Sequence, residues 1–440
     1  MQAGLSTKNA PSPKVVLPHY AYAAFAFIAA SILLYFSAND LISTTLSPKI
    51  LSMVHVLVLG WASMMIFGAL YQLIPVVMEI KLYSEKLAMA SFILLGIGTP
   101  LMAISFWTSF IGATIMMIAG GTLVLLSVLL FVINTLLSAR KSDIKSIENR
   151  FIVTSGFWLL IAVSYGLLMI IHPNILSHNS LQIHIHLGII GWFMTLIVGV
   201  ASVLMPMFFI SHQLNRKYLT AAYWVINGGL LFLLVSFYLK ANTYIIVAAA
   251  TTIIVGFILF IKYNYDAYKK RLRRKLDIGM KHSVLAFVLL FITLTAAFIS
   301  AFGDAFGNVV MHRAIVIYGI SLFFGFITSL ILGQMYKTLP FIIWLKLYQD
   351  KVGKFKTPLP ADMHSQKVAD LHYQSFVTAF VILLAGLLFS SVLLIKIAAI
   401  LMLITALLYT YNTIKVLAHK EKLEPLVFPK PKPIPKTKAN

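Results

Sequence analysis

The chain has 440 residues, of which 60% are hydrophobic and 11% are charged, and its formal net charge is +22. A soluble domain carries roughly 25% charged residues, and a single globule of this composition would have too little polar surface to cover its apolar side chains. The composition therefore indicates an integral membrane protein surrounded by lipid. The sequence contains no cysteine, which excludes disulfides, thiolate metal sites, iron–sulfur clusters and a cysteine nucleophile.

Residues 1–18 form a polar N-terminal tail without a small-residue cleavage site after an apolar run, so we expect no cleaved signal peptide. Apolar runs of about 20 residues or more follow, which is the length that a helical crossing of the bilayer requires. The predicted spans are 19–38, 50–78, 87–106, 109–137, 151–171, 181–211, 219–239, 242–262, 282–301, 308–345, 372–394 and 396–416. Residues 417–440 form a tail rich in Lys and Pro, which we expect to be disordered.

The basic residues predict the orientation of the chain. Twelve spans place both termini on one side, and of the 35 Lys and Arg residues only Lys49, Lys240, Arg313 and Lys396 then lie on the other side. This asymmetry predicts cytoplasmic termini in a bacterial inner membrane. Because the basic residues lie in loops between apolar runs, we interpret the positive charge as an orientation signal, and we expect a lipid bilayer and no nucleic acid as a partner.

The spans contain an internal repeat. In the second span, His55 is followed by Gly, Trp, Gly and Pro at offsets 5, 6, 13 and 20, and His186 in the sixth span is followed by the same residues at the same offsets. The tenth span shows a weaker version, in which Tyr318 and Gly325 follow His312 at offsets 6 and 13, while Pro340 comes eight residues late. The chain therefore predicts three pseudo-symmetric four-helix arcs, at about 19–137, 151–262 and 282–416, with the second, sixth and tenth spans innermost.

Histidines inside a membrane are costly and suggest function. His55, His184, His186 and His312 lie near the outer ends of their spans, and the repeat predicts one shared depth for the marked three, namely His55, His186 and His312. No carboxylate accompanies these histidines, as would be usual for a zinc or manganese site. Haem b needs one or two axial histidines and an apolar slot, so we expect haem iron as the ligand.

The number of haems is left open by the sequence. His184 and His186 are two residues apart and point about 200° apart around a helix, so one span can serve two pockets. One hypothesis pairs His55 with one of them and His312 with the other, giving up to two haems. The competing arrangement is a single haem between His55 and His312. Arg313 is a candidate for pairing with a haem propionate, because Arg binds carboxylates in bidentate fashion, or it is a plain interfacial residue.

The remaining histidines receive plainer predictions. The outer loop 172–178 contains His172 and His178, which either bind copper or are exposed loop residues. His19, His282 and His372 fall at the inner ends of predicted helices, and we interpret them as interfacial.

Three arcs of four helices with histidines on the second, sixth and tenth spans resemble the haem-copper oxidase subunit I superfamily. That superfamily includes cytochrome oxidases and the nitric oxide reductase large subunit, and the resemblance extends to NnrS-type membrane proteins. It covers the whole chain as architecture, but as a motif it rests on residues 55–75, 186–206 and 333–341. The resemblance implies that His55 matches a low-spin haem ligand, His312 a haem-ligand position, and His184 or His186 a copper-ligand position.

The chain departs from that family in its copper ligands. His312 stands alone, with Val310 two residues before it, and the span 219–239 has no histidine, so the three-His copper site is incomplete. The expectation is a haem b redox protein acting in respiratory electron transfer, or in oxygen or nitric oxide chemistry. Quinol or cytochrome c are possible electron donors, and partner subunits are possible. The alternative is a transporter or sensor that uses the histidines for a metal ion or haem.

Overall fold

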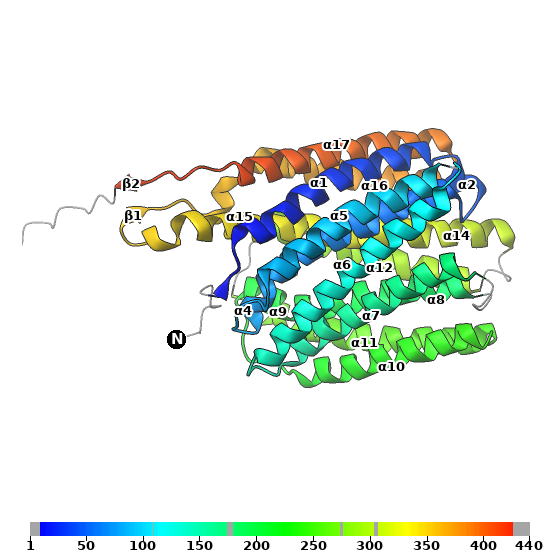
Figure 1. Cartoon of the computed structure of the whole chain (residues 1–440), viewed down its shortest axis with the longest axis horizontal. Helices are drawn as coiled ribbons and strands as arrows, with labels where there is room; N and C mark the ends of the chain where they lie inside the picture. The colour runs from blue at the N-terminus through cyan, green and yellow to red at the C-terminus, as the bar shows by residue number, and fades with distance from the viewer. Residues whose placement is uncertain (1–8, 109, 174–178, 273–275, 303–306, 426–440) are drawn as a thin grey trace, which may run out of the picture.

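The computed structural model describes residues 9–108, 110–173, 179–272, 276–302 and 307–425. Within these residues, twelve helices are long and apolar enough to cross a membrane, so the protein is an all-α, multi-pass membrane protein, as predicted (Figure 1). Nine crossings are single helices: α1 (Pro13–Phe36), α5 (Glu85–Trp107), α6 (Ala113–Lys141), α7 (Ile147–Ile171), α10 (Lys217–Tyr238), α11 (Thr243–Lys269), α12 (Ile278–Ala301), α16 (Gln366–Leu388) and α17 (Val392–Leu417).

The second, sixth and tenth crossings each contain a π-helical segment in the middle. Their parts are α3 (Pro48–His55), η2 (Val56–Ser63) and α4 (Met64–Val77); α8 (Ser180–His186), η3 (Leu187–Met194) and α9 (Thr195–Phe209); and α14 (Asn308–Ile320), η4 (Ser321–Ile327) and α15 (Thr328–Tyr348). π-Helix is rare and is frequently found at functional sites. Its presence in the same three crossings supports the predicted threefold repeat.

The remaining elements are short and lie in the connections. They are α2 (Asp40–Ser43), the 3₁₀ turns η5 (Gln349–Lys351) and η6 (Pro360–Met363), and the strands β1 (Phe355–Lys356) and β2 (Glu424–Pro425). The two strands pair antiparallel, with Phe355 opposite Pro425. We call the end of the bundle where α1 begins and α17 ends the termini end, and the opposite end the far end.

Side-chain caps set several helix starts that hydropathy alone placed wrongly. The first crossing begins at Pro13, six residues before the predicted 19, because the Ser12 side chain accepts a hydrogen bond from the backbone of the new helix. The eleventh crossing begins directly after its cap, Ser365, instead of at the predicted residue 372. The turn between α16 and α17 lies at residues 389–391, where Ser391 caps α17, instead of at the predicted residue 395. His178 and residues 426–440 of the predicted tail lie outside the described residues.

The structure corrects the register of the repeat in the tenth crossing. The segments η2 and η3 begin directly after His55 and His186, whereas η4 begins after Ile320. Aligned on the π-helical segments, Gly325, Gly333 and Pro340 of the tenth crossing take the places of the two repeat glycines and the proline, with the same spacings of eight and seven residues as in the other two crossings. Pro340 is therefore in register, and His312 is eight residues out of it.

Close helix packing confirms the corrected register. A Cβ atom on Gly68 would lie 2.5 Å from Cβ of His19, and one on Gly199 would lie 2.6 Å from Cβ of Phe151. A Cβ atom on Gly333 would lie 2.7 Å from Cβ of His282. In each unit, the first helix thus packs directly on the second glycine of the marked crossing, which is possible only without a side chain there.

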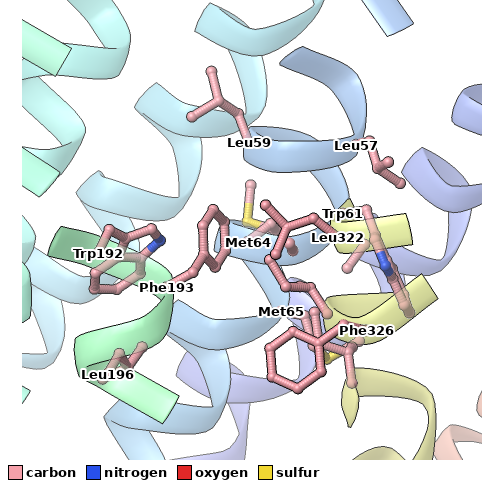
Figure 2. Close-up of a cluster of buried hydrophobic side chains, with 14 of the residues drawn as sticks. Leu57, Leu59, Trp61, Met64, Met65, Trp192, Phe193, Leu196, Leu322 and Phe326 are labelled. Carbon is pink, nitrogen blue, oxygen red and sulfur yellow. The ribbon is translucent and has the colours of Figure 1, made fainter. Parts of the chain in front are cut away.

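The middle of the bundle is filled by large apolar side chains from the three π-helical crossings. Figure 2 shows Trp61, Trp192, Phe193 and Phe326 from these crossings around the same centre, and each of them is at most 1% exposed. The Trp61 indole donates to Thr328 Oγ1 and the Trp192 indole donates to Ser63 Oγ, both at 3.2 Å. The innermost position of these crossings is as predicted, but the centre is a packed core.

Replacing Ser63 by alanine tests the hydrogen bonds between these crossings. The variant would leave the fully buried Trp192 N–H without an acceptor, which costs about 1–3 kcal/mol of folding free energy. Ser31→Ala is the matched control, because the equally buried Ser31 hydroxyl bonds only to a carbonyl of its own helix. Denaturant unfolding in detergent should show a loss for Ser63→Ala that clearly exceeds that for Ser31→Ala; equal losses would contradict the role of this bond.

Candidate histidine site at the far end

The structure places the predicted site residues in the far-end halves of the three π-helical crossings. His55 ends α3, His184 and His186 end α8, and His312 and Arg313 lie in the first turns of α14. All five side chains are half-buried. The predicted location near the far end is therefore confirmed, and the individual surroundings decide which residues can act together.

His55 and His184 each present a free ligand nitrogen. Nδ1 of His55 lies 2.8 Å from the Leu51 carbonyl oxygen, and Nδ1 of His184 lies 3.0 Å from the Ala162 carbonyl oxygen. A carbonyl can only accept, so the proton of each ring is on Nδ1. The lone pair then sits on Nε2, which is the arrangement found in metal-ligating histidines.

These two imidazoles come from different helices and lie close enough for their charges to interact. The His55 ring stacks on Phe106 of α5 with centroids 4.9 Å apart. The His184 ring lies against Gly166 of α7, where a Cβ would come within 2.7 Å of Cε1. His55 is therefore held against the first unit and His184 against the second, and Gly166 is the residue that makes room for the His184 ring.

His186 points to a different neighbour, as the two-residue spacing predicted. Its Nδ1 bonds to the Gln182 carbonyl at 2.8 Å, and its ring centroid lies 5.0 Å from that of Phe237 on α10. Like the other two, it has Nε2 left for a ligand. His184 and His186 thus face α7 and α10 respectively, so one crossing does serve two sides.

The prediction of one shared depth for three histidines is wrong. His55 and His186 directly precede their π-helical segments, but Ile320 holds that position in the tenth crossing. His312 lies eight residues before Ile320, or about 12 Å further along the helix at 1.5 Å per residue. Its buried Nε2 has no hydrogen-bond partner. The corrected register removes the symmetry argument for a single haem between His55 and His312.

Among the described residues, no group of three or more His, Asp and Glu side chains is arranged to hold a metal ion. Trp61, Trp192, Phe193 and Phe326 fill the centre between the repeats (Figure 2). A haem held by His55 and His184 would take one ligand from the first unit and one from the second. The chemistry of the donors fits such a group, since each supplies a neutral imidazole with Nε2 free.

Sequence reasoning misjudged the histidines of the termini end. His19, His282 and His372 were predicted to be interfacial, but all three are 0% exposed. Caps before residues 19 and 372 extend those helices outward, so these positions lie deeper than hydropathy indicated. A repeated pattern in the sequence could have found two of them. Tyr71 and Tyr336 occupy equivalent places in the corrected register, and the first helix of each of these two units carries a histidine, His19 or His282.

A cavity of about 570 Å³ opens at the termini end between α4, α7 and α9. Its lining includes Glu148, which is 3% exposed and whose Oε1 lies 3.5 Å from Nε of Arg216. Glu79 and Gln213, on its rim, both have positive φ, at 52° and 56°, a conformation that few residues other than glycine adopt. The sequence analysis did not single out this polar opening, and it is separate from the far-end histidines.

A comparison with protein-family models and with curated protein sequences finds no match to this chain.

Proposed function

We propose that the protein is a haem b-binding membrane redox protein of the cytochrome oxidase subunit I type, with His55 and His184 as the axial ligands. The observation that carries the proposal is the pair itself. Two neighbouring imidazoles from different helices each hold a proton on Nδ1 and keep Nε2 free.

Backbone hydrogen bonds prepare these ligands for iron. The Leu51 and Ala162 carbonyls fix both rings and make Nε2 more basic, which strengthens a metal bond. Haem with two histidine ligands supplies one-electron redox chemistry and has no open position for a gas. Electron transfer is therefore the function favoured by this pair, ahead of oxygen or nitric oxide reduction.

The proposal extends to the setting of the protein. The four basic residues on the far side against 31 on the other favour cytoplasmic termini in a bacterial inner membrane, with the histidine pair near the outer face. Quinol or cytochrome c would be the electron donor, and Arg313 is kept as a candidate anchor for a propionate. His186, with a free Nε2 of its own, and His312 are the candidates for a second haem.

The test is a reduced-minus-oxidised absorption spectrum of the purified protein together with a pyridine haemochrome count. We expect a sharp Soret band, a reduced α-band and about one haem b per chain for the His55–His184 pair, or about two if His186 and His312 form another site. A colourless protein with a haem count of zero would contradict the proposal and favour the alternative of a metal transporter or sensor.

A further inference from the structure

Two histidines in the third unit form a buried pair at the termini end, apart from the far-end histidines. His282 of α12 and His372 of α16 have ring centroids 5.2 Å apart, and both residues are 0% exposed. Neither has a role in the proposed haem site, since they lie at the opposite ends of their crossings from His55 and His184.

The hydrogen bonds of His282 fix its proton. The Ser329 hydroxyl donates its only proton to the His282 backbone carbonyl, at 2.9 Å. Nδ1 of His282, 3.3 Å from Ser329 Oγ, must therefore be the donor to that oxygen. Nε2 of His282 is left as a bare lone pair, buried and without a partner.

His372 makes even fewer hydrogen bonds than His282. Both of its ring nitrogens are buried without a hydrogen-bond partner. A buried polar atom left unpaired costs about 1–3 kcal/mol, so native proteins rarely keep several together. The aromatic rings of Tyr336 and Tyr409 pack around His372, with centroids at 5.7 and 6.0 Å. The pair thus offers imidazole lone pairs in a buried enclosure lined by aromatic rings.

The charge of the surroundings selects the ligand. Within the described residues, no carboxylate bonds to either ring, and the chain has no cysteine. The cost of burying an ion rises steeply with its charge, so an uncompensated divalent ion is disfavoured here. Imidazole binds copper well, and copper(I) carries a single charge and needs only two ligands. We propose that His282 and His372 form a two-coordinate binding site for a copper(I)-type cation.

The observed spacing is close to what such a site needs. Metal–imidazole bonds of about 2 Å on each side would place the two ring centroids roughly 6 Å apart. The rings are at 5.2 Å with an interplanar angle of 44°, so a small rotation of the side chains would admit the ion between them. A third ligand is not required, in keeping with the lack of any three-residue metal cluster in the described part of the chain.

A further histidine lies on the outer side of this pair, at the termini end. His364, in the connection before α16, is 7% exposed, and its ring centroid lies 5.0 Å from that of Tyr336. Tyr336 in turn contacts His372. Burial lowers the pKa of His364.

The first unit supplies a natural control. His19 occupies the place of His282, Tyr71 the place of Tyr336, and the Phe92 ring lies 4.8 Å from His19, where the third unit has His372. Nδ1 of His19 bonds to the Val15 carbonyl, which leaves one lone nitrogen, Nε2. One imidazole beside a phenyl ring cannot form a two-coordinate site, so only the third unit should bind the ion.

The experiment is an anaerobic titration of the purified full-length protein with copper(I), with bicinchoninate as the competing chromophoric chelator. We expect one copper(I) per chain held against the chelator. His372→Phe, which copies the first unit and should therefore fold, is expected to weaken this binding at least about 100-fold. His19→Ala and His212→Ala should leave it unchanged, and zinc should not compete.

Some results would overturn the site. Wild-type protein that yields all its copper(I) to the chelator would do so, and so would His372→Phe binding as tightly as wild type. An equal loss in His19→Ala would also contradict it. Thermal unfolding of each variant shows whether it is folded, and His282→Ala provides a second removal of the site. Copper is counted separately from haem, so the result does not depend on the haem proposal.

Discussion

Replacement of His55 by alanine is expected to abolish the low-spin haem signal of the purified protein. In the proposed site, His55 and His184 are the two axial ligands, because each holds its proton on Nδ1 and keeps Nε2 free. Losing either should lower the haem content at least about tenfold or convert the retained haem to a high-spin spectrum. Absorption and electron paramagnetic resonance spectra of His55→Ala and His184→Ala measure this.

Two further variants make the result specific. His212→Ala is the control, because His212 is exposed beside the cavity at the termini end. His186→Ala decides the haem count: an unchanged spectrum indicates a single haem at His55 and His184, and loss of about half the haem indicates a second site. An unaltered low-spin spectrum in both His55→Ala and His184→Ala would refute the assigned ligands.

Replacement of Gly333 by alanine is expected to destabilise the protein by about 1–3 kcal/mol, although only one methyl group is added. The new Cβ would lie 2.6 Å from the backbone oxygen of Gly279 and 2.7 Å from Cβ of His282. Neither is the free end of a flexible side chain, so the helices α12 and α15 must move apart. Denaturant-induced unfolding in detergent micelles, followed by circular dichroism, measures the loss.

Gly319→Ala is the matched control in the same crossing. A Cβ atom on Gly319 would meet nothing within 4 Å, and alanine is favoured over glycine inside a helix by about 1 kcal/mol. This variant should be as stable as the wild type or more so. The comparison separates the two registers of the repeat, because an alignment that starts at His312 gives Gly333 no special place. Similar effects at the two glycines would contradict the corrected register.

Much of the architecture followed from hydropathy and spacing. Twelve crossings were predicted and found, and the offsets after His55 and His186 correctly indicated two equivalent crossings. Helix starts were less accurate, because a cap such as Ser365 depends on one hydroxyl and carries little weight in an average over 20 residues. The tenth crossing was misaligned because the histidine, the most visible member of the motif, is replaced there by Ile320.

The sequence by itself determined that the chain lies in a membrane, how many times it crosses, and that three crossings share a pattern. These properties depend on the sum of many apolar residues or on spacing along one helix, and both are written in the chain directly. Tertiary structure alone decided that His184 lies against Gly166, that His282 meets His372, and that Trp61 and Trp192 close the centre. Such contacts depend on how helices rotate and how closely their glycines let them approach, and neither quantity is visible until the helices are packed together.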